Sequence, residues 1–339
     1  MDQFNLLECT LRDGGYITNW QFSHEMICQI IKGLTDAHFD MIEVGYLNRK
    51  PYEQGSSVFQ TIEQIAEYLP VDRHGTLYLA MADVQQFLPE DITPFTGDSI
   101  DGIRVVFYKH QIREALMLCK AVRMAGYKLL VQPMVTIDYS VGEYAQLVRE
   151  VAKLDPFAVS VVDSFGYMCK TDFRAYFRIL DNILAHEVLI GFHSHNNMDL
   201  AFVTAQDVLE YVTTRKLIVD CSLYGMGRGA GNLQSELIAN YYNMTLGEKY
   251  DLSQILSLIG KYILPIKEKK IWGYSPYFLL TARYHCHPNF ACYLLENHSL
   301  SVMDFERYLQ MIPDEMKTKC RKPYVEQLFQ EYKKIYKGT

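Results

Sequence analysis

Two histidines separated by a single residue are the first feature of this sequence that could carry chemistry. His193 and His195 close an apolar run that begins at Leu189, and alternate side chains of a β-strand point to the same side. Two imidazoles on one side of a strand can bind one metal ion. The turn Leu11-Arg-Asp-Gly, which also follows an apolar run, offers a carboxylate for the same ion. The pattern predicts a divalent-metal site if Asp13 and the two histidines meet in space.

The elements that must bring these residues together are short apolar runs that alternate with stretches of helical pattern. Between the first two runs, Ser23 fits a helix N-cap, and Ile27, Ile30 and Ile31 repeat with helical spacing. Alternation about every 30 residues predicts parallel strands with helical crossovers. The eight candidate strands are Leu6–Thr10, Met41–Tyr46, Leu77–Met81, Ile103–Tyr108, Leu129–Val135, Ala158–Val162, Leu189–His193 and Ile218–Leu223.

Eight such repeats within roughly 250 residues predict a TIM (β/α)8 barrel. A doubly wound open sheet is the alternative, but the barrel fits the size better. After Tyr250 the alternation ends and the sequence becomes helical and aromatic. We therefore expect a catalytic barrel over residues 1–250 and a helical C-terminal region over 251–339. Its last stretch, Met303–Tyr336, has the pattern of an amphipathic helix, which we expect to pack on its own barrel rather than on another subunit.

Composition and charge exclude several classes of protein. The 339 residues are 49% hydrophobic and 22% charged, which is enough to bury a large core. A formal charge of -7 without a basic stripe argues against nucleic acid as a partner. Neither a secretory signal nor an apolar run of roughly 18 residues is present, so we expect a cytoplasmic protein with no membrane contact. The eight cysteines have no CxxC spacing, which favours reduced thiols over a zinc knuckle or disulfides.

Polar residues end many of the apolar runs, and the chemistry of a barrel lies at the carboxyl ends of its strands. Each of these residues also has a structural alternative, such as a rim histidine, a local ion pair or, for Asn232, a helix cap. The loop 225–231 superficially resembles a phosphate cradle, but its glycines fall at every second position. That spacing favours a tight turn beside the metal site. The polar residues at strand ends are Arg12, Asp13, Glu43, Asp163, Ser164, His193, His195 and Asn232.

Four motifs carry a resemblance to a known family: LRDGGY, IEVGY around Glu43, GFHSHNNMDLA and GMGRGAGN. Together they resemble the DRE-TIM metallolyase superfamily of pyruvate aldolases and acyl-CoA-condensing barrels. The segment WGYSPYFLLTARYHCHPNF is similar to the start of the C-terminal region of the 4-hydroxy-2-oxovalerate aldolase branch. The resemblance implies a metal-dependent aldolase that forms or cleaves a pyruvate-derived 4-hydroxy-2-oxo acid through a pyruvate enolate. Its small-molecule partners would be a 2-oxo acid and an aldehyde.

The resemblance also implies a metal centre. Asp13, His193 and His195 would ligate a divalent ion, with Asn232 as a further contact and His193 also beside the substrate. We expect Mn²⁺ or Mg²⁺ first, and Zn²⁺ or Co²⁺ as alternatives. A metal on the ketone oxygen of pyruvate makes the methyl protons acidic.

Other residues take roles around that centre by the same resemblance. Arg12 would stabilise the enolate oxygen, and Glu43 would orient Arg12 and Asp13. Ser164 matches a position that contacts the pyruvate carboxylate. Tyr274 would reach over the site from the C-terminal region, with Tyr277 as the competing assignment.

One position departs from the family pattern. Tyr16 stands where the aldolase branch carries a histidine and the condensing branch usually a glutamine. A tyrosine has an ordinary pKa of about 10 and is a poor base at neutral pH, so Tyr16 would donate a proton or shape the acceptor pocket. Two other functions stay open: an acyl-CoA-dependent condensing enzyme, and a non-catalytic barrel subunit. We also expect a homo-oligomer, and a partner dehydrogenase on the C-terminal region is a further hypothesis.

Overall fold

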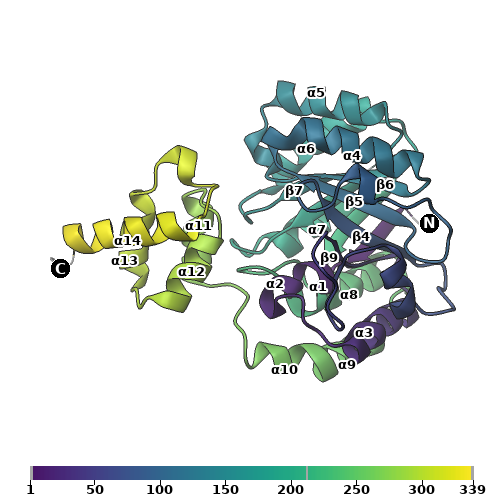
Figure 1. The fold of residues 1–339 in the computed structure, drawn as a ribbon, viewed down its shortest axis with the longest axis horizontal. Coiled ribbons are helices and arrows are strands. Elements are labelled where there is room, and N and C mark those ends of the chain that lie inside the picture. The colour runs from purple at the N-terminus through teal and green to yellow at the C-terminus, as the bar shows by residue number, and fades with distance from the viewer. Residues whose placement is uncertain (1–2, 211–212, 337–339) are drawn as a thin grey trace.

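Eight parallel strands close into a barrel in the computed structural model, which describes residues 3–210 and 213–336 (Figure 1). Residues 1–2, 211–212 and 337–339, which include the outer ends of both predicted domains, lie outside the described residues. Pairing of the first strand with both its neighbours closes the cylinder. The barrel strands are β1 (Phe4–Glu8), β2 (Met41–Leu47), β4 (Leu77–Asp83), β5 (Gly102–Phe107), β6 (Lys128–Pro133), β7 (Ala158–Asp163), β8 (Leu189–Ser194) and β9 (Leu217–Cys221).

The TIM barrel predicted from the sequence is confirmed. Each of the eight apolar runs overlaps one barrel strand, and the pairing of Leu7 with Met41 between β1 and β2 rules out an open sheet. A short additional strand, β3 (Val58–Phe59), pairs with the end of β2.

The inside of the barrel changes from apolar to charged along the strands. An apolar cluster inside takes Met41 from β2 and Ile218 from β9. Side chains two residues apart on a strand share a side, so the next inward positions are Glu43 and Asp220, both buried. The same alternation leads from Leu189 on β8 towards the histidines. The strand periodicity therefore places charged groups inside the cylinder.

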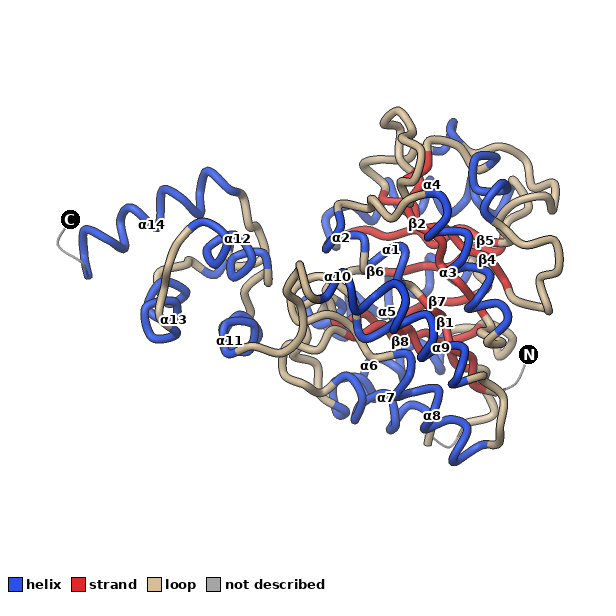
Figure 2. The backbone as a smooth tube through the Cα atoms, turned by 90° about the horizontal axis from the view of Figure 1, so that it is seen from below, coloured by secondary structure: helices blue, strands red, loops and turns tan. Residues whose placement is uncertain are grey.

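Amphipathic helices cover the outside of the barrel (Figures 1 and 2). Ser23 caps the helix α3 (His24–Asp36) as predicted, because its side chain accepts a hydrogen bond from the Met26 amide, and Ile27, Ile30 and Ile31 are fully buried. No helix within the described residues combines the length and apolar character needed to cross a membrane. The helices of the barrel are α1 (Thr10–Asp13), α2 (Gly15–Thr18), α3 (His24–Asp36), α4 (Ile112–Met124), α5 (Val141–Ala152), α6 (Lys170–Ile183), α7 (Ala201–Leu209) and α8 (Ser235–Leu246).

Two crossovers differ from the predicted strand–helix alternation. The described residues between β2 and β4 contain β3 and the short 3₁₀ helix η1 (Glu63–Tyr68), and those between β4 and β5 contain only η2 (Pro89–Asp91). Prolines and glycines interrupt both segments, and proline removes a backbone donor from a helix interior. The expectation of a regular α-helix in every crossover was therefore wrong at these two places.

The chain after residue 250 divides between two apolar cores. The helices α9 (Leu252–Leu258) and α10 (Leu264–Lys267), joined by a π-helical turn, run along the barrel, and Ile255, Ile263 and Trp272 belong to the barrel core. A second core contains Ala230 from the loop after β9, and its members from the C-terminal region begin at Phe278. Figures 1 and 2 show its helices as a separate lobe beside the barrel. These helices are α11 (Pro276–Arg283), α12 (Asn289–Asn297), α13 (Val302–Gln310) and α14 (Lys322–Tyr336).

The packing of the last stretch differs from the prediction. Met303–Tyr336 forms two helices rather than one, and their apolar faces, including Phe305 and Tyr332, pack on the other helices of the second core. The lobe has enough aromatic surface to bury these faces by itself. A domain boundary at residue 250 stays a prediction, and the division of the cores leads us to propose a boundary between Trp272 and Phe278.

A chain that ends at residue 273 should keep the thermal stability of the barrel, whereas one that ends at residue 250 should lose it. The shorter chain lacks Ile255, Leu258 and Ile263, and full burial of one such side chain contributes about 1.5–3 kcal/mol. Circular dichroism melts of the two chains measure the difference. Equal melting temperatures would contradict the assignment of α9 to the barrel core.

Candidate active site

The structure brings the three predicted metal ligands together at the carboxyl ends of the strands. Asp13 ends the single turn α1, which follows β1 directly, while His193 and His195 lie at and just beyond the end of β8. Ligand atoms of the three side chains lie within 4.8 Å of one another, and all three residues are buried. Asp13, His193 and His195, which we call the metal-ligand group, could therefore hold one metal ion.

Hydrogen bonds of the two imidazoles leave one nitrogen of each ready for a metal. His193 Nδ1 lies 2.9 Å from the Asp220 carboxylate, and His195 Nδ1 lies 2.9 Å from the Asp163 carbonyl oxygen. An acceptor at Nδ1 fixes the proton there and leaves Nε2 with a lone pair. His195 Nε2 is buried without a hydrogen-bond partner, and it lies 3.6 Å from the Asp13 carboxylate. Two imidazole nitrogens and one carboxylate fit a divalent ion.

Arg12 is held between two buried carboxylates, Glu43 and Asp13. Its Nε donates to Glu43 at 2.6 Å, and its Nη1 donates to Asp13. Arg12 Nη2 is buried and has no hydrogen-bond partner. One donor of a fixed guanidinium is thus available to a substrate oxygen beside the metal ligands.

Two residues that sequence reasoning missed extend this arrangement across the barrel. Arg104 on β5 donates from Nη1 and Nη2 to the two Asp220 oxygens at 2.6 and 3.0 Å, and its Nε lies 3.6 Å from Glu43. Asp220 on β9 in turn contacts His193. Both lie within strands rather than at strand ends, and the signal was a charge inside an apolar run. We call the connected residues the charge network: Asp13, Arg12, Glu43, Arg104, Asp220 and His193.

The electrostatics of the network favour the metal-binding protonation state. Burial raises the pKa of Asp220, but Arg104 and the hydrogen bond to His193 outweigh it and lower the pKa to about 2. Burial also opposes the ionisation of Asp13, yet Arg12 holds the pKa of Asp13 well below its ordinary value. Burial lowers the pKa of His193. At neutral pH the two carboxylates are charged and this imidazole is neutral, as metal binding requires.

Glu8 is a second buried carboxylate that the sequence analysis did not single out. It accepts hydrogen bonds from the Thr10 amide at 2.9 Å and from the Leu223 amide at 2.8 Å. Burial raises the pKa of Glu8 to about 7, although these hydrogen bonds oppose the shift. The side chain joins the turn that carries Asp13 to the loop after β9.

The glycine-rich loop after β9 packs directly on the metal-ligand group. A Cβ at Gly227 would lie 2.5 Å from Asn232 Nδ2 and 2.7 Å from the Asp13 carboxylate, and one at Gly231, where φ is +76°, would lie 2.1 Å from the Gly225 oxygen. This close approach supports the tight turn over a phosphate cradle. Asn232 Nδ2 donates to Asp13 at 2.7 Å, and its Oδ1 is buried without a partner. Asn232 therefore reaches the group through Asp13.

The remaining predicted residues differ in how they face the site. Ser164 is buried, and its Oγ accepts a hydrogen bond from the Val135 amide at 2.8 Å. Tyr16 is 38% exposed, and its hydroxyl lies 3.2 Å from that of Tyr46. Tyr16 lies in α2, which follows β1 and α1. It is therefore at the mouth of the barrel, the end at which the strands terminate.

The tyrosines predicted to reach over from the C-terminal region have no contact with the site among the described residues. Tyr274 is 56% exposed, and the Tyr277 hydroxyl donates to the Leu300 carbonyl within the lobe. His287 is a residue of this region that does face the barrel: it is buried and packs on Phe165 with ring centres 5.2 Å apart. The geometry therefore gives no support to Tyr274 as a catalytic residue.

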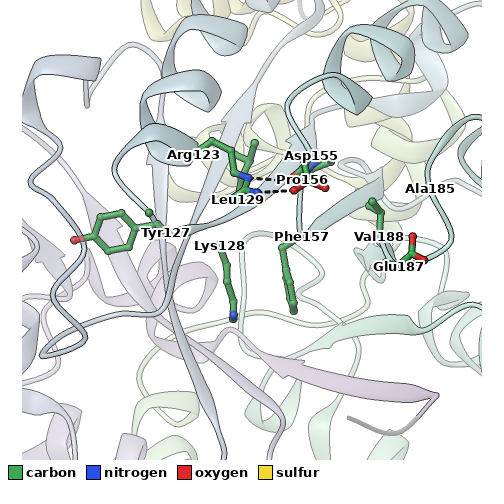
Figure 3. A pocket seen from close by; sticks show the side chains of 11 residues that line it. Arg123, Tyr127, Lys128, Leu129, Asp155, Pro156, Phe157, Ala185, Glu187 and Val188 are labelled. Carbon is green, nitrogen blue, oxygen red and sulfur yellow. Dashed lines mark hydrogen bonds and ion pairs between the residues drawn. The ribbon is translucent and has the colours of Figure 1, made fainter.

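Two pockets lie at opposite ends of the barrel. One of about 490 Å³ is lined by Tyr16 and Tyr46, so it adjoins the candidate site. Another of about 400 Å³ lies where β6 and β7 begin, beside Lys128 and Phe157 (Figure 3). There Arg123 points towards Asp155, with which it forms an ion pair. Because the metal-ligand group lies where the strands end, the pocket of Figure 3 is not part of the candidate site.

Comparisons with known proteins agree with this geometry. The HMGL-like family model matches residues 106–260. A 4-hydroxy-2-oxovalerate aldolase from Geobacillus genomosp. 3 is 27% identical over 277 residues, which cover 78% of this chain and 77% of the relative. An oxaloacetate decarboxylase from Mycobacterium tuberculosis is 25% identical over 235 residues, with 69% and 68% covered. The resemblance to the DRE-TIM metallolyase superfamily is thereby confirmed.

Solved structures share the fold. The N-terminal domain of a candidate aldolase from Bacteroides vulgatus superimposes with a TM-score of 0.75 at 25% identity and covers 86% of this chain and 97% of that domain. The carboxyl transferase domain of Rhizobium etli pyruvate carboxylase has a TM-score of 0.71 at 15% identity, covering 97% of this chain and 60% of that chain. At such low identity the second likeness shows the fold alone.

Replacement of Arg104 by Met should lower the free energy of unfolding by about 3–5 kcal/mol, because removal of one partner leaves buried carboxylates uncompensated. Urea denaturation at pH 7 measures the loss. The matched control is Arg49→Met, since Arg49 forms its ion pairs with Glu90 and Asp91 at the surface and should cost less than about 1 kcal/mol. Equal losses in the two variants would refute a structural role for the charge network.

Replacement of Asp220 by Asn should weaken metal binding about 10- to 100-fold, although all three ligands remain, because a partner that orients a ligating histidine also sets its basicity. Titration calorimetry with Mn²⁺ measures the affinity, and circular dichroism checks the fold. His193→Ala removes a ligand and should abolish binding. Wild-type affinity in the Asp220→Asn protein would show that this carboxylate does not support the site.

Proposed function

Because the HMGL-like family model matches residues 106–260 and the chain folds as a TIM barrel, we propose that it is a divalent-metal-dependent aldolase acting on a pyruvate-derived 4-hydroxy-2-oxo acid. The observation that carries the proposal is the buried convergence of Asp13, His193 and His195 beside a free donor of Arg12. Relatives named 4-hydroxy-2-oxovalerate aldolase support the substrate class.

The proposed metal site uses the three convergent side chains. A divalent ion held by Asp13, His193 and His195 would polarise the ketone of a 2-oxo acid and make its methyl protons acidic. We propose Mn²⁺ or Mg²⁺, with Zn²⁺ and Co²⁺ as alternatives. Asn232 holds Asp13 in place through its amide.

Arg12 is the proposed electrostatic stabiliser of the enolate oxygen. Two of its nitrogens are already engaged by Glu43 and Asp13, so its guanidinium does not need to reorganise when negative charge develops. Preorganised donors of this kind typically contribute about a hundredfold or more in rate. The buried Nη2 is the atom that would donate to the substrate.

The carbon–carbon bond is formed or broken between pyruvate and an aldehyde. In the direction of synthesis, pyruvate loses a methyl proton, the enolate carbon bonds to the aldehyde carbon, and the aldehyde oxygen takes up a proton as the 4-hydroxyl. Ser164 accepts from the Val135 amide, so its hydroxyl proton remains available to a substrate carboxylate. We propose that Tyr16, which lines the pocket at the mouth, contacts the aldehyde.

Decarboxylation of oxaloacetate is a second candidate function, favoured by the relative from Mycobacterium tuberculosis named for that activity. Loss of carbon dioxide from oxaloacetate leaves the same pyruvate enolate, which then takes up a proton. The same metal ligands and Arg12 would serve both reactions. Release of carbon dioxide from oxaloacetate, compared with aldehyde release from 4-hydroxy-2-oxovalerate, separates the two.

Pyruvate in deuterated water should exchange its methyl protons when the protein and Mn²⁺ are present, and a chelator should stop the exchange. Proton NMR follows the methyl signal. Arg12→Met should slow the exchange about a hundredfold, whereas Tyr16→Phe should leave metal bound and exchange intact, because it acts on the aldehyde side. The proposal fails if no exchange occurs with Mn²⁺, Mg²⁺, Zn²⁺ or Co²⁺.

A further inference from the structure

Arg228 is the charged residue of the glycine-rich loop after β9, and it lies beside the metal-ligand group. The residue is half-buried, and its guanidinium carbon lies 5.2 Å from the centre of the Tyr16 ring. Burial lowers the pKa of Arg228, but Tyr16, Tyr108 and Asp13 outweigh it and keep the pKa above its ordinary value. A fixed positive charge is therefore present at the mouth of the barrel.

This charge has no carboxylate partner within the part of the chain that the structure describes. Arg228 Nε is buried without a hydrogen bond, whereas the buried Arg104 is paired with Asp220 and the buried Arg215 with Asp181. The ring of Tyr16 offers no acceptor to this buried N–H, and a buried donor without an acceptor costs free energy. Stability of the fold thus does not explain Arg228, and an anionic ligand would.

The C-terminal lobe supplies a second donor close to this charge. The Asn289 amide donates to His287 Nδ1 at 3.1 Å, so the imidazole proton lies on Nε2. Burial, with the charges of Arg228 and His195, holds the pKa of His287 well below its ordinary value. His287 is therefore a neutral hydrogen-bond donor at pH 7.

The backbone of the loop at Gly229 packs closely against side chains of the lobe. A Cβ at Gly229, where φ is +66°, would lie 3.2 Å from Phe278 and 3.3 Å from Pro288. The side-chain amide of Asn197, in the loop after β8, also donates to the Thr281 hydroxyl at 3.3 Å. These contacts fix the segment that carries His287 against the loop that carries Arg228.

We propose that Arg228, with His287 beside it, binds an anionic group on the aldehyde, so that the acceptor carries a carboxylate or a phosphate at the end away from its carbonyl. The inference rests on the proposed aldolase function and specifies its acceptor. A guanidinium matches either anion with two parallel hydrogen bonds. Tyr16, against which Arg228 stacks, lines the pocket at this end of the barrel.

Three aldehydes test the inference in the metal-loaded enzyme: propanal, succinic semialdehyde and glyceraldehyde 3-phosphate, each with pyruvate. We expect kcat/KM for one of the two charged aldehydes to exceed that for propanal at least about tenfold. Which of the two is preferred identifies carboxylate or phosphate. Arg228→Met should remove the preference for the charged aldehyde over propanal, and Arg228→Lys should restore part of it.

Direct binding gives a readout that does not depend on turnover. Titration calorimetry with succinate and with inorganic phosphate should show one of them binding wild type, and binding at least about tenfold weaker to Arg228→Met. Arg123→Met is the matched control, because it removes the same charge from the pocket at the opposite end of the barrel (Figure 3). It should change neither binding nor aldehyde preference.

Proton exchange of pyruvate, which involves no aldehyde, separates the two proposals. If exchange fails, the aldolase function is wrong, and anion binding by Arg228 is judged by calorimetry alone. If exchange proceeds but the three aldehydes react equally, or if Arg228→Met keeps the wild-type preference, the anion site is refuted. An effect of Arg123→Met as large as that of Arg228→Met would also refute it.

Discussion

The interaction on which the candidate site depends is a line of alternating charges buried inside the barrel. Arg104 lies between Glu43 and Asp220, and Arg12 lies between Glu43 and Asp13. Burial of each charge by itself would cost several kcal/mol, so every member is tolerated only because its neighbours are present. The line ends at Asp13 and at His193, both in the metal-ligand group. The buried charge network and the candidate active site therefore share residues.

The architecture explains how such a line can exist. Parallel strands direct every second side chain inward, and the barrel closes those side chains off from water on all sides. An apolar cluster inside the cylinder includes Met41 and Ile218, and the charged positions follow two residues later on the same strands. The loop after β9 and the turn after β1 then cover the metal-ligand group, and Glu8 joins them. The lobe adds His287 and completes the mouth.

The prediction succeeded where local pattern and fold period agree. Eight apolar runs predicted eight strands. The rule that barrel chemistry lies at strand ends predicted that Asp13, His193 and His195 meet, and the structure brings them together. The prediction failed in the two crossovers where prolines and glycines interrupt the helical pattern. It also failed for Met303–Tyr336, whose aromatic residues pack within their own lobe. Tyr274 was chosen by motif resemblance, and a motif does not say which way a loop side chain points.

By itself, the sequence determined the barrel and the strand-end positions of Asp13, His193 and His195, because hydrophobic period and strand-end position are local properties that can be read from the sequence. Only the tertiary structure decided which charges neutralise one another. Arg104 and Asp220 are 116 residues apart, and nothing between them indicates that they face each other across a cylinder. The same holds for the segments that carry Arg228 and His287, which lie close together because the lobe packs on the loop at Gly229. Partners of a buried charge are set by the three-dimensional fold, since the cost of leaving that charge unpaired depends on what surrounds it.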